Sequence, residues 1–205
     1  MTLNGSRLAL VGCTGWPWWF AAMSDIELEF HDVDDDRWND LVELFEARGG
    51  PHYCWCMAWR RKLAGKKGTK LVLKASLKAR VDEGTPIGIL GYLEGKPVAW
   101  CSIAPRSSYR PLGGPDEPDD EESVWSIVCF FVPRKLRGQG VTVQLIEAAI
   151  ARAKDCGAKI IESYPVDPTS PTYKFMGVTT VFQKAGFARI GPAGKRRHIM
   201  RLKLS

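Results

Sequence analysis

One stretch constrains the fold more than any other: an apolar run, a basic glycine turn and an amphipathic helix follow one another directly. The run covers residues 125–132, and its lack of polar alternation is typical of a strand covered on both faces. The turn contains Gly138 and Gly140, and the spacing of apolar residues after it predicts a helix over Val141–Asp155. A buried strand that leads into an apolar helix indicates an α/β or α+β domain.

Strand and helix patterns alternate along the rest of the chain from residue 26 onward. Short apolar or alternating runs predict strands at 26–31, 87–93, 98–103, 159–164, 187–190 and 198–204. Apolar residues at helical spacing predict helices around 38–45 and 73–81, and a short helix ends near Gly186. No linker rich in proline, glycine and serine divides the pattern, and 205 residues is an ordinary length for one domain. We therefore expect one α/β or α+β domain over residues 23–205.

The composition excludes several classes of protein. With 45% apolar and 25% charged residues, the chain is an ordinary globular protein, neither disordered nor fibrous. The 29 Lys and Arg residues exceed the 23 Asp and Glu residues, and the net charge of +6 favours an anionic ligand. The six cysteines are scattered, and no apolar stretch reaches the roughly 18 residues of a membrane span. We expect a soluble, cytoplasmic protein with reduced thiols and no membrane partner.

Residues 1–22 form a separate, irregular segment. Arg7 and the short apolar run before Cys13 resemble a lipoprotein signal, but the run is shorter than the roughly 7 to 15 residues of a secretory core. We interpret the segment as a leader that is not native, with the natural start at Met23. In the alternative interpretation, its cluster of aromatic residues docks on the domain or on a membrane surface.

The turn after the buried strand has the chemistry of a phosphate-binding loop. Gly138 and Gly140 allow close backbone approach, and the unpaired N–H groups and positive end of the next helix attract an anion. Spacing excludes two known phosphate motifs, because a Walker lysine-serine pair is absent and the third glycine of a dinucleotide fingerprint would fall at Val143. On the turn alone, an ordinary glycine turn that caps a core helix stays an equal alternative.

Two motifs resemble those of the GNAT superfamily of N-acetyltransferases. Residues 135–140 match its pyrophosphate loop, Gln/Arg-x-x-Gly-x-Gly/Ala, except that Lys135 stands in the Gln/Arg position. Residues 182–187 are similar to the late helix of the family, which ends in Lys-x-Gly-Phe, and the order of elements agrees over residues 26–204. The resemblance implies an α+β domain with a twisted mixed sheet of about seven strands, flanked by helices, with the fourth and fifth strands splayed apart.

The resemblance also implies a ligand and its binding residues. The co-substrate would be acetyl-CoA, with no metal. The residues expected to line its pantetheine arm and to cradle its pyrophosphate are Phe130, Phe131, Val132, Arg137, Gly138, Gln139, Gly140, Val141 and Thr142. The acceptor would be a primary amine of a small molecule or peptide that attacks the thioester directly. Its identity is not predicted by the sequence, and neither is the oligomeric state, for which a homodimer stays open.

Direct attack requires a proton acceptor, because only about one aliphatic amine in a few thousand is unprotonated at neutral pH. We predict Glu162 as the base, since a carboxyl group on an apolar strand is costly to bury without a partner. Many relatives carry a tyrosine acid where this chain has Phe182, so Tyr173 or Tyr164 would take that role, and we select Tyr173. In the alternatives, Glu162 faces water or pairs with an arginine, and the tyrosines only pack. The vacant acid position also supports a non-catalytic acyl-CoA-binding regulatory module.

The sequence His-Tyr-Cys-Trp-Cys at residues 52–56 is a second concentration of reactive groups. Zinc would need about four ligands, and no second Cys/His pair lies nearby in sequence. A Cys54 or Cys56 nucleophile activated by His52 is an alternative, but no third orienting group is evident. We expect residues 54–59 to pack an acceptor-side wall, while residues 60–62, which are Arg, Arg and Lys, stay in solvent.

Two charged segments flank the predicted site. The acidic residues of 116–122 form a solvated loop or attract a cationic acceptor, and the basic residues 195–197 lie free or meet the 3′-phosphate of the cofactor. A nucleic-acid-binding domain is the looser alternative, because aromatic and basic residues do not interleave on one strand. We therefore expect no nucleic-acid partner.

Overall fold

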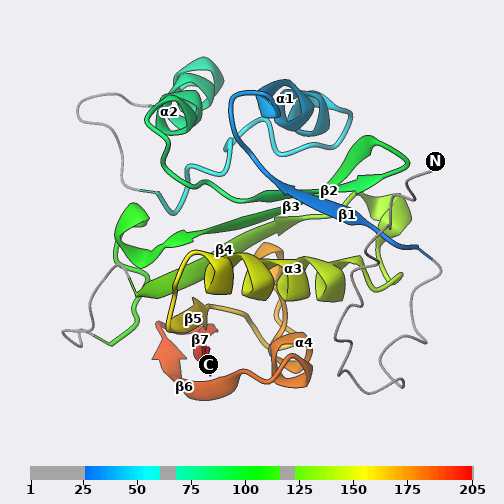
Figure 1. Ribbon diagram of the computed structural model, residues 1–205. Coiled ribbons are helices and arrows are strands. Elements are labelled where there is room, and N and C mark those ends of the chain that lie inside the picture. Colours follow the sequence, from blue (N-terminus) through cyan, green and yellow to red (C-terminus); the bar gives the residue numbers. More distant parts are fainter. Residues whose placement is uncertain (1–25, 61–67, 116–122, 205) are drawn as a thin grey trace, which may run out of the picture.

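Seven strands form one sheet in the order β1-β2-β3-β4-β5-β7-β6 in the computed structural model, which describes residues 26–60, 68–115 and 123–204 (Figure 1). The strands are β1 (Glu29–Asp32), β2 (Ile89–Leu93), β3 (Lys96–Pro105), β4 (Val124–Phe131), β5 (Ile160–Ser163), β6 (Ala188–Ala193) and β7 (Arg197–Lys203). The helices of these residues are α1 (Trp38–Glu46), α2 (Lys70–Asp82), α3 (Val141–Asp155) and α4 (Thr179–Lys184), with single 3-10 turns η2 (Arg106–Ser108), η3 (Arg134–Leu136) and η4 (Lys174–Met176). The expectation for residues 1–22 lies outside the described residues.

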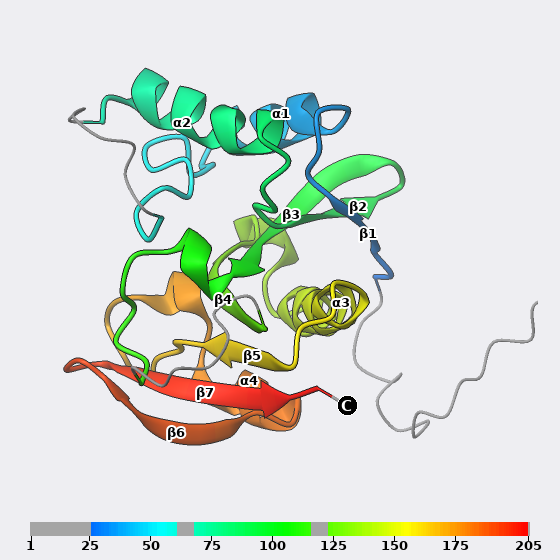
Figure 2. The ribbon, with the colours of Figure 1, turned by 60° about the vertical axis from the view of Figure 1, so that its left-hand side comes forward.

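The sheet is mixed, as predicted. Strands β1 to β4 form an antiparallel meander, β4 and β5 run parallel, and β5, β7 and β6 are again antiparallel. The parallel pair requires a crossover, which α3 supplies. Figure 2 shows the two groups, with β5, β7 and β6 on the far side of α3 from β1 and β2.

Strands β4 and β5 pair along only part of their length. Their register runs from Val124 opposite Ile160 to Ile127 opposite Ser163. Residues 128–131 of β4 continue past this point with no β5 partner in the described chain. Their N–H and C=O groups on that edge are left for another partner, so the predicted splay of the fourth and fifth strands is confirmed.

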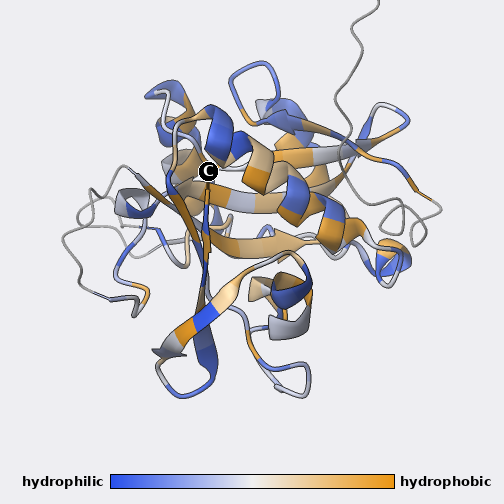
Figure 3. Ribbon diagram, turned by 60° about the horizontal axis from the view of Figure 1, so that its bottom comes forward, coloured by the Kyte–Doolittle hydropathy of each residue, from blue (hydrophilic) through white to orange (hydrophobic). Residues whose placement is uncertain are grey.

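The helices cover both faces of the sheet. Helix α3 lies below β3 and β4 in Figure 1, while α1 and α2 lie above β1 to β3. The buried residues of α3 recur at helical spacing and are Val141, Leu145, Ile146, Ala149 and Ala153. Burying each Leu or Ile contributes about 2 kcal/mol, which fixes α3, and the turn before it, against the sheet. Figure 3 shows the strongly apolar central strands and the mixed colouring of the helices.

An aromatic cluster joins α1 to the sheet through the loop that follows it. The indole of Trp55, from that loop, stacks on Trp38 with ring centroids 6.0 Å apart. Phe45 of α1 makes an edge contact with Trp100 of β3 at 5.6 Å. These large side chains are buried, and with Cys56 and Met57, also buried, they fix residues 55–57 against the sheet.

Candidate active site

The turn between β4 and α3 presents a row of backbone N–H groups. Gly138 and Gly140 have φ of 80° and 77°, left-handed values that only glycine adopts without strain. Within the described residues, no group accepts a hydrogen bond from the amides of residues 138–142. Gly140 is also the N-cap of α3, whose positive end adds to these donors. The turn is therefore an open cradle for an anion.

Side chains of the turn fold back and fix its shape. The Nε of Arg137 donates to the carbonyl oxygen of Val132 at 2.9 Å, and Nε2 of Gln139 donates to the carbonyl oxygen of Lys135 at 2.8 Å. The first bond holds a guanidinium beside the end of β4, and the second closes the loop on itself.

A cavity of about 540 Å³ opens beside the splayed end of β4. Residues predicted to bind the cofactor form one wall: Phe130, Phe131, Val132, Arg137 and Thr142. The loop after α1 and the segment at η4 form the opposite wall, with Tyr53, Cys54, Cys56, Trp59, Lys174 and Phe175. The fold thus joins the end of β4, the anion cradle and two distant loops around one space.

A second cavity, of about 560 Å³, continues from the first and shares Gly49, Phe131 and Arg137 with it. Its charged lining residues are Arg48, Arg134, Lys135 and Arg137, against the single acid Glu43. The combined groove is cationic at one end and largely apolar at the other. Such a groove fits a long ligand with phosphates at one end and an uncharged arm at the other.

Comparisons with known proteins agree with this geometry. Residues 19–177 match the sequence model of the acetyltransferase (GNAT) family. The chain belongs to this family. No curated protein matches it by sequence.

Solved GNAT structures resemble this chain in fold at low identity. An N-acetyltransferase from Staphylococcus aureus Mu50 is 13% identical, with a TM-score of 0.53 over 87% of this chain and 99% of that one. The putative acetyltransferase yncA from Salmonella typhimurium, with its cofactor acetyl-CoA, is 14% identical, with a TM-score of 0.54 over 87% and 94%. The aminoglycoside acetyltransferase AAC(6')-Ib, in complex with coenzyme A, is 16% identical, with a TM-score of 0.56 over 86% and 95%.

The predicted base of this GNAT protein, Glu162, lies on β5 and is fully buried. Its carboxylate accepts from Nε of Arg201 at 2.7 Å and from the hydroxyl of Tyr164, and it lies 3.5 Å from Nη1 of Arg106. It does not line the 540 Å³ cavity. Glu162 is therefore paired with arginines, as the alternative interpretation of the sequence expects. Its role as the catalytic base stays a prediction. No sequence pattern indicates either arginine as a partner, because strand register and loop packing bring them to the carboxylate.

The two candidate acids of the GNAT protein differ in environment. Tyr164 is fully buried, and burial followed by the neighbouring Glu162 carboxylate raises the pKa of its phenol well above the ordinary value. Tyr173 is 38% exposed, and its ring centroid lies 6.3 Å from that of Trp59. Tyr173 does not line the cavity, but it directly precedes Lys174 and Phe175, which do. Tyr173 is the better placed of the two.

The loop after α1 corrects one expectation. Arg60 does not stay in solvent: it is 1% exposed, and its Nη2 donates to Ser102 Oγ at 3.0 Å and to the carbonyl oxygen of Ile87. This guanidinium anchors the loop to Ser102 of β3, which the basic run in the sequence did not reveal. His52 stacks edge-on with Tyr53 at 6.2 Å. Residues 61 and 62 lie outside the described residues.

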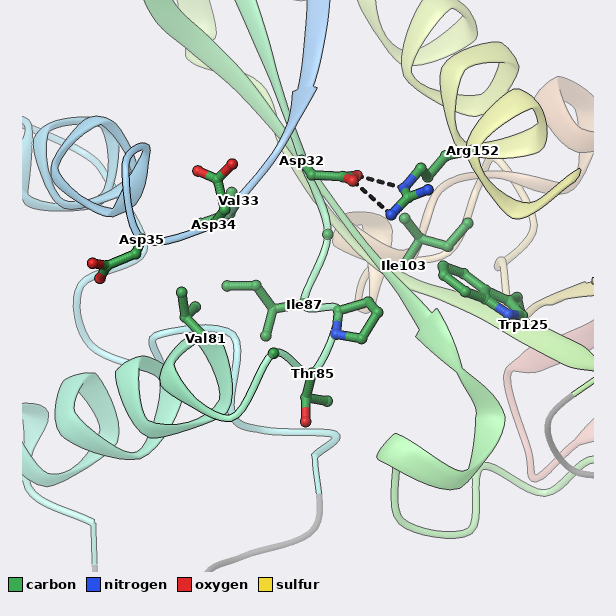
Figure 4. A pocket seen from close by; sticks show the side chains of 13 residues that line it. Asp32, Val33, Asp34, Asp35, Val81, Thr85, Ile87, Ile103, Trp125 and Arg152 are labelled. Atoms are coloured by element: carbon green, nitrogen blue, oxygen red, sulfur yellow. Dashed lines mark hydrogen bonds and ion pairs between the residues drawn. The ribbon is translucent and has the colours of Figure 1, made fainter. Parts of the chain in front are cut away.

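A smaller crevice of about 160 Å³ lies near α2 and β1, away from the cradle (Figure 4). Its acids are already paired: Asp32 with Arg152 at 2.6 Å, Asp34 with Arg37 at 3.1 Å and Asp35 with Lys78 at 2.7 Å. These pairs join β1 to α3 and the start of α1 to α2, so the crevice has a structural role.

Within residues 26–60, 68–115 and 123–204, no group of three or more His, Cys, Asp or Glu side chains has metal-ligand geometry. The expectation of no metal stays a prediction. None of the helices in these ranges is long and apolar enough to span a bilayer.

Proposed function

We propose that this GNAT protein transfers an acetyl group from acetyl-CoA to a primary amine of a small molecule or peptide. The observation that carries the proposal is the continuity of the anion cradle, at residues 138–142, with the cavity along the unpaired end of β4. A pyrophosphate on the cradle directs the pantetheine arm toward Phe130 and Phe131. The N–H and C=O groups of residues 128–131 on that edge are available for the amides of the arm.

The acceptor enters from the opposite wall. Tyr53 and Phe175 line the cavity there and are well exposed, which suits the apolar part of an acceptor. No carboxylate from the described residues lines the cavity, so on direct attack the proton of the amine would pass to water or, through water, to Glu162. Direct attack stays the expectation from the sequence. The reducing cytoplasm is the proposed location, on the scattered cysteines of the sequence.

A non-catalytic acyl-CoA-binding module is the second candidate. It is favoured by Phe182, which fills the usual acid position and packs against Phe130 and Phe187 with centroids 6.1 and 5.1 Å away. Such a module would bind CoA without catalysing acyl transfer.

Two measurements test the proposal. Calorimetric titration with CoA should show a single site, and acetyl-CoA with a panel of primary amines should release thiol in an amine-dependent way. Binding without amine-dependent release would favour the module, and the absence of CoA binding would contradict both functions.

A further inference from the structure

Trp59, in the cavity wall formed by the loop after α1, lies against two arginines from distant parts of the chain. The guanidinium carbon of Arg110, after η2, is 4.4 Å from the centroid of the Trp59 ring. That of Arg197, at the start of β7, is 4.5 Å from the same centroid. The ring centroid of Tyr173 is 6.3 Å from the indole. Four separate segments thus bring two cations and two aromatic rings together beside the cavity.

Hydrogen bonds hold the segments of this cluster in place. The backbone N–H of Arg110 donates to the carbonyl oxygen of Trp59 at 3.0 Å. In the turn before β7, Nη1 of Arg196 donates to Oγ1 of Thr172 at 2.9 Å, which ties that turn to the segment that carries Tyr173. Because the groups are already positioned, a ligand that binds to them loses less free energy in ordering the protein.

The two arginines that lie against Trp59 have no anionic partner among residues 26–60, 68–115 and 123–204. No carboxylate in these ranges lies within 4.0 Å of either guanidinium. Nη1 of Arg197 is buried and has no hydrogen-bond partner there. Burial lowers the pKa of Arg197, and the positive charge of Arg110 lowers it further. Because two like charges at one ring repel each other, a bound anion would stabilise both.

Other groups beside the cluster are also suited to an anion. The indole Nε1 of Trp59 is a buried donor without a hydrogen-bond partner in the described chain. Lys174 adds a positive charge to the same cavity, and none of the described residues that line this cavity is an acid. Guanidinium, ammonium and indole groups only donate hydrogen bonds, so the matching ligand group is one that only accepts them.

We propose that the acceptor amine of this GNAT protein carries an anionic oxygen group, a carboxylate or a phosphate, which binds at Arg110 and Arg197 beside Trp59. This inference rests on the proposed function and narrows its acceptor. The two arginines do not line the cavity themselves, so the anionic end of the acceptor lies next to Trp59 while its amine reaches into the cavity. Guanidinium groups bind both kinds of anion through paired, parallel hydrogen bonds, which would orient the acceptor as well as hold it.

Matched sets of acceptors test this preference. Each set contains an ω-amino acid, its carboxamide and the aminoalkyl phosphate of the same length, over a series of chain lengths, so the reacting amine is kept while the charge at the other end changes. In thiol-release assays with acetyl-CoA, we expect kcat/KM for an anionic member to exceed that for the carboxamide by about tenfold or more. The preferred anion distinguishes a carboxylate from a phosphate. Equal kcat/KM for the charged and uncharged members of every set would overturn the proposal.

Arg110→Gln and Arg197→Gln assign the preference to the cluster. We expect each variant to reduce it about tenfold, through a higher KM for the anionic acceptor, with unchanged CoA affinity. Arg189→Gln removes the same charge from an exposed position on β6 and is the matched control, which should keep the wild-type preference. A preference that survives in both cluster variants, or that falls as much in the control, would overturn the proposal.

Calorimetry distinguishes failure of this inference from failure of the proposed function. The CoA-saturated protein is titrated with the same sets, so that acceptor binding is measured without turnover. Tighter binding of an anionic member, lost in Arg110→Gln and Arg197→Gln, would support the anion site. Equal or undetectable binding of all members would overturn it even where thiol is released. Binding of the anionic amines without any thiol release from acetyl-CoA would contradict the proposed function and leave the anion site standing.

Discussion

The Nε of Arg201 donates to Oε2 of Glu162 at 2.7 Å, between adjacent strands β7 and β5. Arg106 approaches the same oxygen from η2 at 3.5 Å, and the carboxylate is fully buried. Two cations and one anion thus share a largely buried site. Removing the anion would leave buried positive charge uncompensated, which is among the most destabilising changes a core can suffer.

Glu162→Gln is therefore expected to lower the free energy of unfolding by about 3 kcal/mol. Urea unfolding measures this loss, with Glu27→Gln, an exposed acid, as the control that should change little. The kcat/KM of the variant, measured across pH below its unfolding midpoint, tests the predicted base. Wild-type stability together with a collapse of kcat/KM at every pH would favour a base over a counter-ion.

Gly138→Ala tests the anion cradle. Its φ of 80° is left-handed, and a β-carbon there would meet no atom within 4 Å, so the cost is conformational, about 1 to 2 kcal/mol. Relaxation of the turn would move the amides, and we expect CoA affinity to fall about tenfold, which is about 1.4 kcal/mol. Gly194→Ala, with φ of 74° and equally open surroundings between β6 and β7, is the matched control. An equal loss of CoA affinity in both variants would contradict the cradle.

The central part of the fold is predictable from sequence because it depends on local periodicity. The predicted helix Val141–Asp155 has the observed bounds of α3, and the predicted strand at 125–132 differs from β4 by one residue at each end. The glycine turn lies between two elements with a strong apolar pattern. Its position in the chain therefore follows from local sequence alone, without any tertiary contact.

The surroundings of the reactive groups were not predictable in the same way. Glu162 meets Arg201 because β5 and β7 are in register, and Cys56 meets Trp100 because a loop packs on β3. Arg60 is the first residue of a basic run that the pattern predicts to be in solvent, yet it is buried. Such contacts depend on strand register and loop packing over long sequence separations, which single-sequence patterns do not encode.

Tyr173→Phe tests the candidate acid. A thiol leaves far more readily than an alkoxide, so protonation of the departing sulfur is helpful without being required. We expect kcat to fall by about tenfold, with CoA affinity unchanged, in steady-state assays of thiol release. Because the ring contact with Trp59 survives the change, an altered acceptor KM is not expected. Unchanged kcat would remove Tyr173 as the acid.

Cys56, whose Sγ accepts a hydrogen bond from the indole N–H of Trp100 at 3.3 Å, predicts a distinct pH dependence of alkylation. Its lowered pKa means that the thiolate persists below the roughly 8.5 at which a free cysteine titrates, and is lost only as the pH falls through the lower value. Alkylation of Cys56, followed by mass mapping, should therefore stay fast at neutral pH and slow in acid. Trp100→Phe removes the indole donor and should move the midpoint upward. Cys156, which is exposed and whose pKa is raised by burial and neighbouring acids, should show the opposite displacement in the same samples. Equal midpoints for Cys56 and Cys156 would contradict a stabilised thiolate in the cavity wall.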